Sequence, residues 1–159
     1  MPVAAASTAG MYRDIVRELA NACILQFAAI RGPGNGVGNG SCCASVRVAN
    51  TPAGLPDYRF GNSQAQYLDA DAINAGGMFN AANHAERQAH NAGTLAGGYA
   101  PHLFVELPPC GGAYGCAAWC AATIAGVNVW YLYPNSVAMV AAHAGGTAAE
   151  FLALNAALP

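Results

Sequence analysis

The chain has 159 residues, more than half of them hydrophobic, and a net charge of −2 at neutral pH. All six basic residues are arginines, so the composition excludes a protein that attracts nucleic acid through a strongly positive overall charge. We find no apolar run long enough to cross a bilayer and no N-terminal signal peptide, which predicts a soluble protein with no membrane partner.

The length favours a single domain over residues 1–159. Apolar residues recur at helical spacing from Met11 to Phe27, which predicts an N-terminal helix within residues 1–30, capped by Ser7 or Thr8. Residues 31–41 are rich in glycine and predict a flexible loop. The remaining residues, 42–159, are expected to form the core of the domain.

Strands and helices alternate through this core. The hydrophobic patterns predict strands over 43–49, 58–60, 102–107 and 127–133, and helices over 83–91, 115–126 and 147–157. Asn83 is expected to cap one helix and Gly93 to end it, and Thr147 and Glu150 form a capping box. Residues 136–140 fit either a strand or a helix. The order predicts an α/β layered domain in which helices flank a mixed sheet of four or five strands.

The six cysteines fall into two groups. Cys23 belongs to the apolar stripe of the first helix, and the adjacent Cys42 and Cys43 point to opposite faces of a strand, so none of these suggests a functional role. The later cysteines, at positions 110, 116 and 120, are expected to be reduced thiols with a metal role.

Two short segments carry the chemistry. His84-Ala85-Glu86 opens a predicted helix, whereas Pro109-Cys110 follows a predicted strand and Cys116 begins the next helix. One imidazole and two thiolates would hold Zn²⁺ and leave its fourth position to water, whose pKa zinc lowers to roughly 7. Glu86 would then transfer protons without binding the metal.

This ordered set resembles the cytidine deaminase superfamily, whose pattern is His-x-Glu followed by Pro-Cys and a second cysteine. The resemblance implies a three-layer fold and zinc-dependent hydrolytic deamination of a nucleobase. It also implies zinc ligation by His84, Cys110 and Cys116, and proton transfer by Glu86. Five residues separate the two cysteines where the family has two, so Cys120 stands as an alternative to Cys110 as the second cysteine ligand.

Within the superfamily, the compact domain and its glycine-rich loops most resemble bacterial toxin deaminases. That resemblance implies conversion of cytosine to uracil in nucleic acid, with single- or double-stranded DNA favoured. It also implies delivery into a target-cell cytoplasm and an immunity protein as partner. A free cytidine, deoxycytidine or nucleotide substrate stays open, because the chain lacks lysine and has a negative net charge. The residues do not separate cytosine from adenine, or DNA from RNA.

Four residues are candidates for substrate binding. Tyr114 and Trp119 could stack on a base, Arg59 could reach a phosphate, and Asn50 could bind a sugar hydroxyl. Two of them have a structural alternative: Trp119 fits a core position, and Asn50 before Thr51-Pro52 fits a turn. Arg87 could likewise reach a phosphate or lie on the exposed helix face.

Two further classes of function stay open at this point. A thiol hydrolase would use Cys116 as nucleophile and His143 as base, since His143 alone among the histidines follows it in the chain. A zinc-stabilised binding module would use the same ligands without catalysis.

Overall fold

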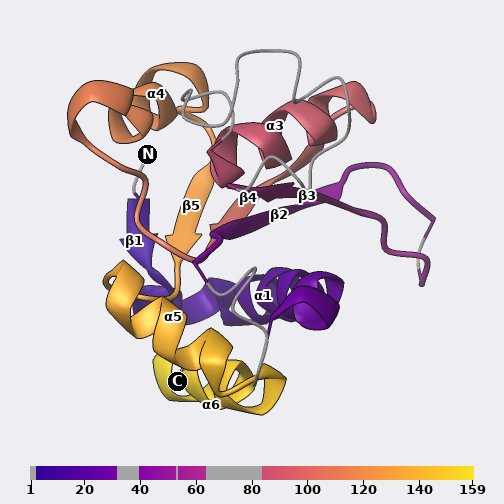
Figure 1. The fold of residues 1–159 in the computed structure, drawn as a ribbon. Coiled ribbons are helices and arrows are strands. Elements are labelled where there is room, and N and C mark those ends of the chain that lie inside the picture. Colours follow the sequence, from indigo (N-terminus) through magenta and orange to yellow (C-terminus); the bar gives the residue numbers. More distant parts are fainter. Residues whose placement is uncertain (1–2, 32–39, 53, 64–83) are drawn as a thin grey trace.

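A mixed five-stranded sheet forms the centre of the computed structural model, which describes residues 3–31, 40–52, 54–63 and 84–159 (Figure 1). The strands are β1 (Val3–Ala5), β2 (Cys43–Val48), β3 (Tyr58–Asn62), β4 (Tyr99–Val105) and β5 (Asn128–Tyr131). Their order across the sheet is β1-β5-β4-β2-β3. β1 and β4 run parallel to β5, whereas β2 is antiparallel to β3 and β4.

Helices cover both faces of this sheet, as the sequence predicted. The α-helices of the described residues are α1 (Arg13–Phe27), α3 (Ala85–Leu95), α4 (Cys116–Thr123), α5 (Ser136–Ala144) and α6 (Thr147–Ala157). Figure 1 places α3 and α4 on one side, and α1 and α6 on the other, with α5 beside α6. Within the described part of the chain, no helix combines the length and apolar character that crossing a membrane requires.

The strands alternate their side chains between two hydrophobic clusters, because successive residues of a strand point to opposite faces. Cys43 and Phe104 belong to the cluster under α1 and α6. Val46 and Leu103 belong to the cluster under α3 and α4. The buried Ser45 hydroxyl donates a hydrogen bond to the Leu19 carbonyl oxygen at 2.7 Å, so the sheet is also tied to α1 by a polar contact.

Cys23 and Cys43 form a disulfide that joins α1 to β2. Cys23 is fully buried, as its place in the apolar stripe predicted, but its pairing with Cys43 was missed. The other four cysteines, Cys42, Cys110, Cys116 and Cys120, are free.

The N-terminal segment differs from the prediction. Its first three described residues form β1 at the edge of the sheet, which was not predicted because three small residues carry no periodicity. Two 3₁₀ turns follow, and α1 begins only at Arg13. The N-cap of α1 is therefore Tyr12, and neither Ser7 nor Thr8 as predicted. The Thr8 hydroxyl instead donates to the Ala5 carbonyl oxygen.

The end of α3 and the start of α6 also differ from the prediction. Gly93 lies inside α3, where a Cβ would come within 2.8 Å of the Val46 side chain and 2.7 Å of the Tyr99 ring. This glycine therefore serves close packing against the sheet and does not end the helix. Thr147 begins α6 without a capping hydrogen bond, and Glu150 is buried in an ion-pair cluster.

Residues 136–140, left open by the sequence, belong to helix α5. The Asn135 side chain accepts a hydrogen bond from the Ala138 N–H at 3.0 Å and so caps this helix. The expected cap Asn83 and most of the glycine-rich loop, residues 32–39, lie outside the described residues.

Candidate metal and catalytic site

His84 stands at the N-terminus of α3, and a close approach of this helix to β3 fixes its place. Its backbone is extended, and its carbonyl oxygen accepts hydrogen bonds from the N–H groups of Arg87 and Gln88, each at 3.1 Å. A Cβ on Gly61 of β3 would lie only 2.0 Å from the Ala85 carbonyl oxygen. Glycine at this position therefore lets the first turn of α3 lie directly on the strand.

Cys110 lies in the segment between β4 and α4, and Cys116 is the first residue of α4. Gly112 and Gly115 adopt positive φ angles of 66° and 58°, which other residues adopt at a cost. The Ala117 N–H donates to the Cys110 carbonyl oxygen at 3.0 Å, so the loop returns on itself. The five residues between Cys110 and Cys116 thus fold into a turn that places both sulfurs on the same side.

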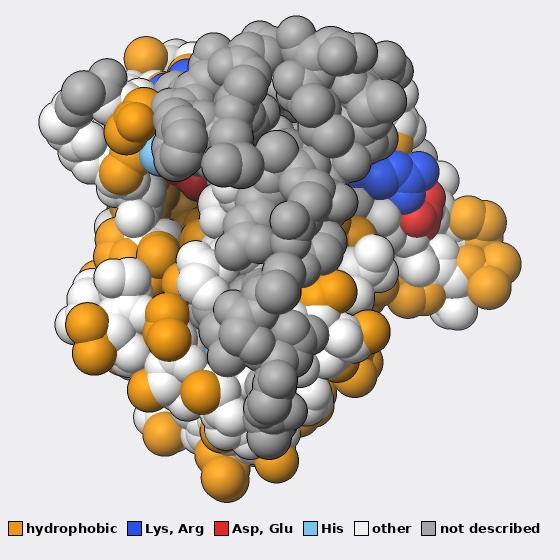
Figure 2. All heavy atoms as spheres, in the orientation of Figure 1, with side chains coloured by type: hydrophobic (Ala, Val, Ile, Leu, Met, Phe, Trp, Pro, Cys, Tyr) orange, Lys and Arg blue, Asp and Glu red, His pale blue; other side chains and the backbone are white. Residues whose placement is uncertain are grey.

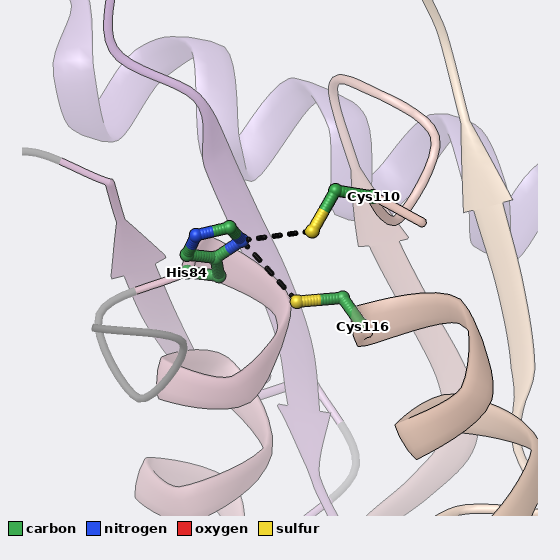
Figure 3. A group of neighbouring side chains, drawn as sticks. All are labelled: His84, Cys110 and Cys116. Carbon is green, nitrogen blue, oxygen red and sulfur yellow. Dashed lines mark hydrogen bonds between the residues drawn. The ribbon is translucent and has the colours of Figure 1, made fainter. Parts of the chain in front are cut away.

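The imidazole of His84 meets both of these sulfurs. Its Nδ1 lies 3.4 Å from Cys110 Sγ and 3.2 Å from Cys116 Sγ (Figure 3). The three ligand atoms all lie within 4.8 Å of one another, a group that could hold a metal ion. Cys120, the alternative ligand, does not belong to this group, and its buried side chain packs in the hydrophobic cluster under α4.

Glu86 is buried beside Cys116, one of the three candidate ligands. Its Oε1 atom is inaccessible to solvent and has no hydrogen-bond partner among the described residues. Burial, followed by the neighbouring Glu86 carboxylate, raises the pKa of the Cys116 thiol above its ordinary value. A cation bound by His84, Cys110 and Cys116 would relieve this crowding of acidic groups, because it favours thiolate and carboxylate together.

Tyr114 lies at the edge of the site. Its ring centroid is 4.9 Å from that of His84, and 43% of its surface is exposed. Trp119 of α4 packs instead against α3. The Arg87 guanidinium lies 5.0 Å from the centroid of its ring, and the His90 ring meets it edge-on at 5.3 Å. The structure therefore brings Tyr114 to the candidate ligands and gives Trp119 packing contacts.

Asn50, a further candidate for substrate binding, lies toward the opposite end of β4 from Cys110. Val48, two residues before Asn50, pairs with Tyr99 at the start of β4, whereas Cys110 follows the end of β4. The prediction that Asn50 lies near the site is therefore not met; its φ of 58° shows a turn conformation instead. Arg59 on edge strand β3 forms an ion pair with Asp57, its neighbour two residues away.

A second cluster of ionisable groups was not foreseen. Glu106, directly after β4, and Glu150 of α6 both accept hydrogen bonds from Arg31, and His143 Nε2 lies 3.1 and 3.2 Å from the same two carboxylates. All four residues are buried. The geometry of the two glutamates and the histidine could also hold a metal ion. However, the Arg31 guanidinium already pairs with both carboxylates, and a protonated imidazole balances the remaining charge.

The surroundings of His143 favour its protonated form. Burial alone would lower its pKa, but its hydrogen bonds to Glu106 and Glu150 outweigh that effect and raise the pKa to about 9. One feature of the local sequence indicates such a cluster: Glu106 follows an apolar strand, and a glutamate buried at such a position must be paired. The identity of its partners could not be read, because Arg31 and His143 lie far away along the chain.

Comparison with known proteins gives no relative. No protein-family model matches the chain, and no curated protein or solved structure matches it either.

Proposed function

We propose that this protein is a zinc-dependent hydrolytic deaminase acting on a cytosine-type ring. One observation carries the proposal: the buried carboxylate of Glu86 lies beside Cys116 of the His-Cys-Cys group, and one of its oxygens has no hydrogen-bond partner among the described residues. A purely structural site would not need a buried acid with an unsatisfied oxygen beside its ligands, since burying such an atom costs free energy.

The donor set supports zinc. One imidazole and two thiolates are soft ligands that suit Zn²⁺, and three protein ligands are typical of a catalytic site with an open position. The residues that would hold the ion are His84, Cys110 and Cys116. When bound, zinc would act as a Lewis acid that lowers the pKa of water to about 7.

Glu86 would move the protons. Its Oε1, which has no hydrogen-bond partner among the described residues, can accept one proton from the attacking water and deliver it to the ring nitrogen. It can then carry the second proton, from the resulting hydroxyl, to the amine, which leaves as ammonia. Cytosine and water would thus give uracil and ammonia. Because this carboxylate is buried, bulk water cannot readily exchange with the proton that it carries.

The layout of the chain supports the same proposal. The His-x-Glu segment stands at the start of α3, Cys110 lies between β4 and α4, and Cys116 is the first residue of α4. Helices lie on both sides of the sheet. This is the arrangement that the resemblance to the cytidine deaminase superfamily implies. Tyr114, half-exposed beside His84, is the best candidate for stacking on the base.

The distribution of arginines bears on the substrate class. The resemblance to toxin deaminases favours cytosine in DNA, but half of the six arginines are already paired with carboxylates: Arg31, Arg47 and Arg59. On the face drawn in Figure 2, the basic side chains of the described residues form no continuous stripe. Because proteins grip nucleic acid mainly through Lys and Arg, this placement favours a free cytidine or deoxycytidine as the second candidate substrate.

The thiol-hydrolase alternative receives less support. The nucleophile of such an enzyme needs a lowered thiol pKa, whereas burial and Glu86 raise that of Cys116. The predicted base, His143, is buried and hydrogen-bonded to Glu106 and Glu150.

The proposal is tested with zinc-loaded protein incubated separately with single-stranded DNA, duplex DNA, RNA and free cytidine. Ammonia release and sequencing of the polymers report deamination. Glu86→Gln should lower turnover about 10²–10⁴-fold while zinc content and folding stay unchanged. Turnover that survives this substitution would refute the assignment of Glu86, and zinc-loaded protein inactive on all four substrates would favour a binding module.

A further inference from the structure

Arg87 connects the helix that carries His84 to the loop that carries the two cysteines. It follows Glu86 on α3, and its Nη2 donates a hydrogen bond to the Tyr114 carbonyl oxygen at 2.9 Å. Tyr114 lies between Cys110 and Cys116 in sequence, so the contact reaches the middle of the ligand loop. The sequence left Arg87 either to a phosphate or to solvent, and the structure gives it this contact within the chain.

The same guanidinium also contacts helix α4. Its Cζ lies 5.0 Å from the centroid of the Trp119 ring, a cation–π contact. Trp119 follows Cys116 by less than one helical turn. His90, one turn further along α3 than Arg87, meets the same indole edge-on at 5.3 Å. Two side chains of α3 therefore hold the start of α4.

The ligand loop needs such support because its own sequence is permissive. Three of the five residues between the cysteines are glycines, and two of these adopt positive φ angles. Glycines give the unfolded loop a large conformational freedom that ordering must overcome. Within the loop, the hydrogen bond from Ala117 N–H to the Cys110 carbonyl joins the cysteines to each other. It does not join them to His84, which belongs to α3.

We propose that Arg87 is the positioning residue that holds Cys110 and Cys116 opposite His84, and so sets the affinity of the site for its metal ion. It does this through one hydrogen bond to the loop and one stacking contact to α4, without touching the ion. A planar guanidinium can stack and donate in its plane at the same time, whereas a lysine ammonium cannot reproduce this geometry. The inference rests on the metal group of the proposed function and not on its reaction.

The test measures zinc affinity by competition with a chromophoric chelator for wild type, Arg87→Gln and Arg87→Lys. Both variants should bind Zn²⁺ about 10–100-fold more weakly, the range found when groups that orient metal ligands are removed. Substitution with Co²⁺ gives a second readout, because the thiolate-to-cobalt absorption reports whether both sulfurs still coordinate. We expect this absorption to weaken in both variants.

Arg47→Gln is the matched control. Arg47 pairs with Glu18 of α1 on the other side of the sheet, so its loss should leave zinc affinity within threefold of wild type. Trp119→Leu removes the stacking partner and should weaken zinc binding as well. If Arg87 and Trp119 act as one unit, the double variant should lose less affinity than the two single losses combined.

Two results would overturn the inference: zinc affinity within threefold of wild type in both Arg87 variants, or an unchanged cobalt spectrum in both. Should Arg87→Gln fail to fold, Arg87→Lys and Trp119→Leu supply the same comparison. Because none of these measurements involves deamination, a wild-type protein that binds zinc but deaminates nothing would defeat the proposed function and leave this inference standing.

Discussion

Substituting Gly61 by alanine should displace the first turn of α3 and disturb the metal ligands. The added Cβ would lie 2.0 Å from the Ala85 carbonyl oxygen and 2.8 Å from the Ala89 nitrogen, whereas ordinary Cβ contacts begin at 3.4 Å. Both neighbours are backbone atoms, so no side chain can rotate away. Strand and helix must therefore separate by about 1.4 Å at this point.

Two quantities should change in Gly61→Ala. Overpacking of this kind costs about 1–3 kcal/mol of unfolding free energy, which urea denaturation measures. His84 directly precedes Ala85, so displacing this turn also displaces a candidate ligand. Zinc affinity should then fall by about 10–100-fold, as it does when groups that orient metal ligands are lost. Chelator competition measures this second effect.

Gly126→Ala is the matched control, because a Cβ there meets nothing within 4 Å. It should change neither stability nor zinc affinity appreciably. If Gly61→Ala proves as stable as the control and binds zinc equally well, β3 and α3 cannot lie as close as the structure places them, and the reasoning fails.

Three further predictions concern the fold. The pKa of His143 is raised to about 9 from an ordinary 6.5. Its protonated imidazole therefore stabilises the folded protein fully below about pH 6.5, and this contribution is lost as the pH rises through 9. The difference is worth about 3 kcal/mol, so the stability gap between wild type and His143→Gln should shrink from pH 6 to pH 10; a constant gap would contradict the buried cluster. Cys23→Ala should lower stability by about 3 kcal/mol under oxidising conditions, and reductant should then destabilise wild type but not the variant; equal responses would argue against the bond to Cys43. Asn135→Ala should cost about 1 kcal/mol because it removes a helix cap, whereas Thr147→Ala should cost less than about 0.5 kcal/mol; equal losses in thermal unfolding would contradict the observed caps.

The layered α/β fold was predictable because local patterns decide it. The apolar stripe of α1 and the short apolar runs of β4 and β5 appear directly in the sequence. Exact ends were less predictable. Glycine commonly ends helices, so Gly93 predicted a helix end. In the structure it lies inside α3 instead, where Tyr99 and Val46 leave no space for a larger side chain.

The candidate ligands were predictable for a similar reason. His84 and Cys116 begin helices and Cys110 follows a strand, and an α/β sheet gathers such positions at one edge. What the sequence did not contain was the partner of each polar group. Glu150 fitted a local capping box, yet its carboxylate pairs with Arg31, which lies more than a hundred positions earlier in the chain. Pairings over such distances depend on the assembled fold.

The most direct measurement is the zinc content of purified, folded protein after equilibration with Zn²⁺ and removal of excess metal. We predict one zinc ion per chain in wild type and in Cys120→Ser, and none in His84→Ala or Cys116→Ser, with all four proteins folded by circular dichroism. A folded wild-type protein that retains no zinc, or one that keeps its zinc after loss of His84 and Cys116, would contradict the site.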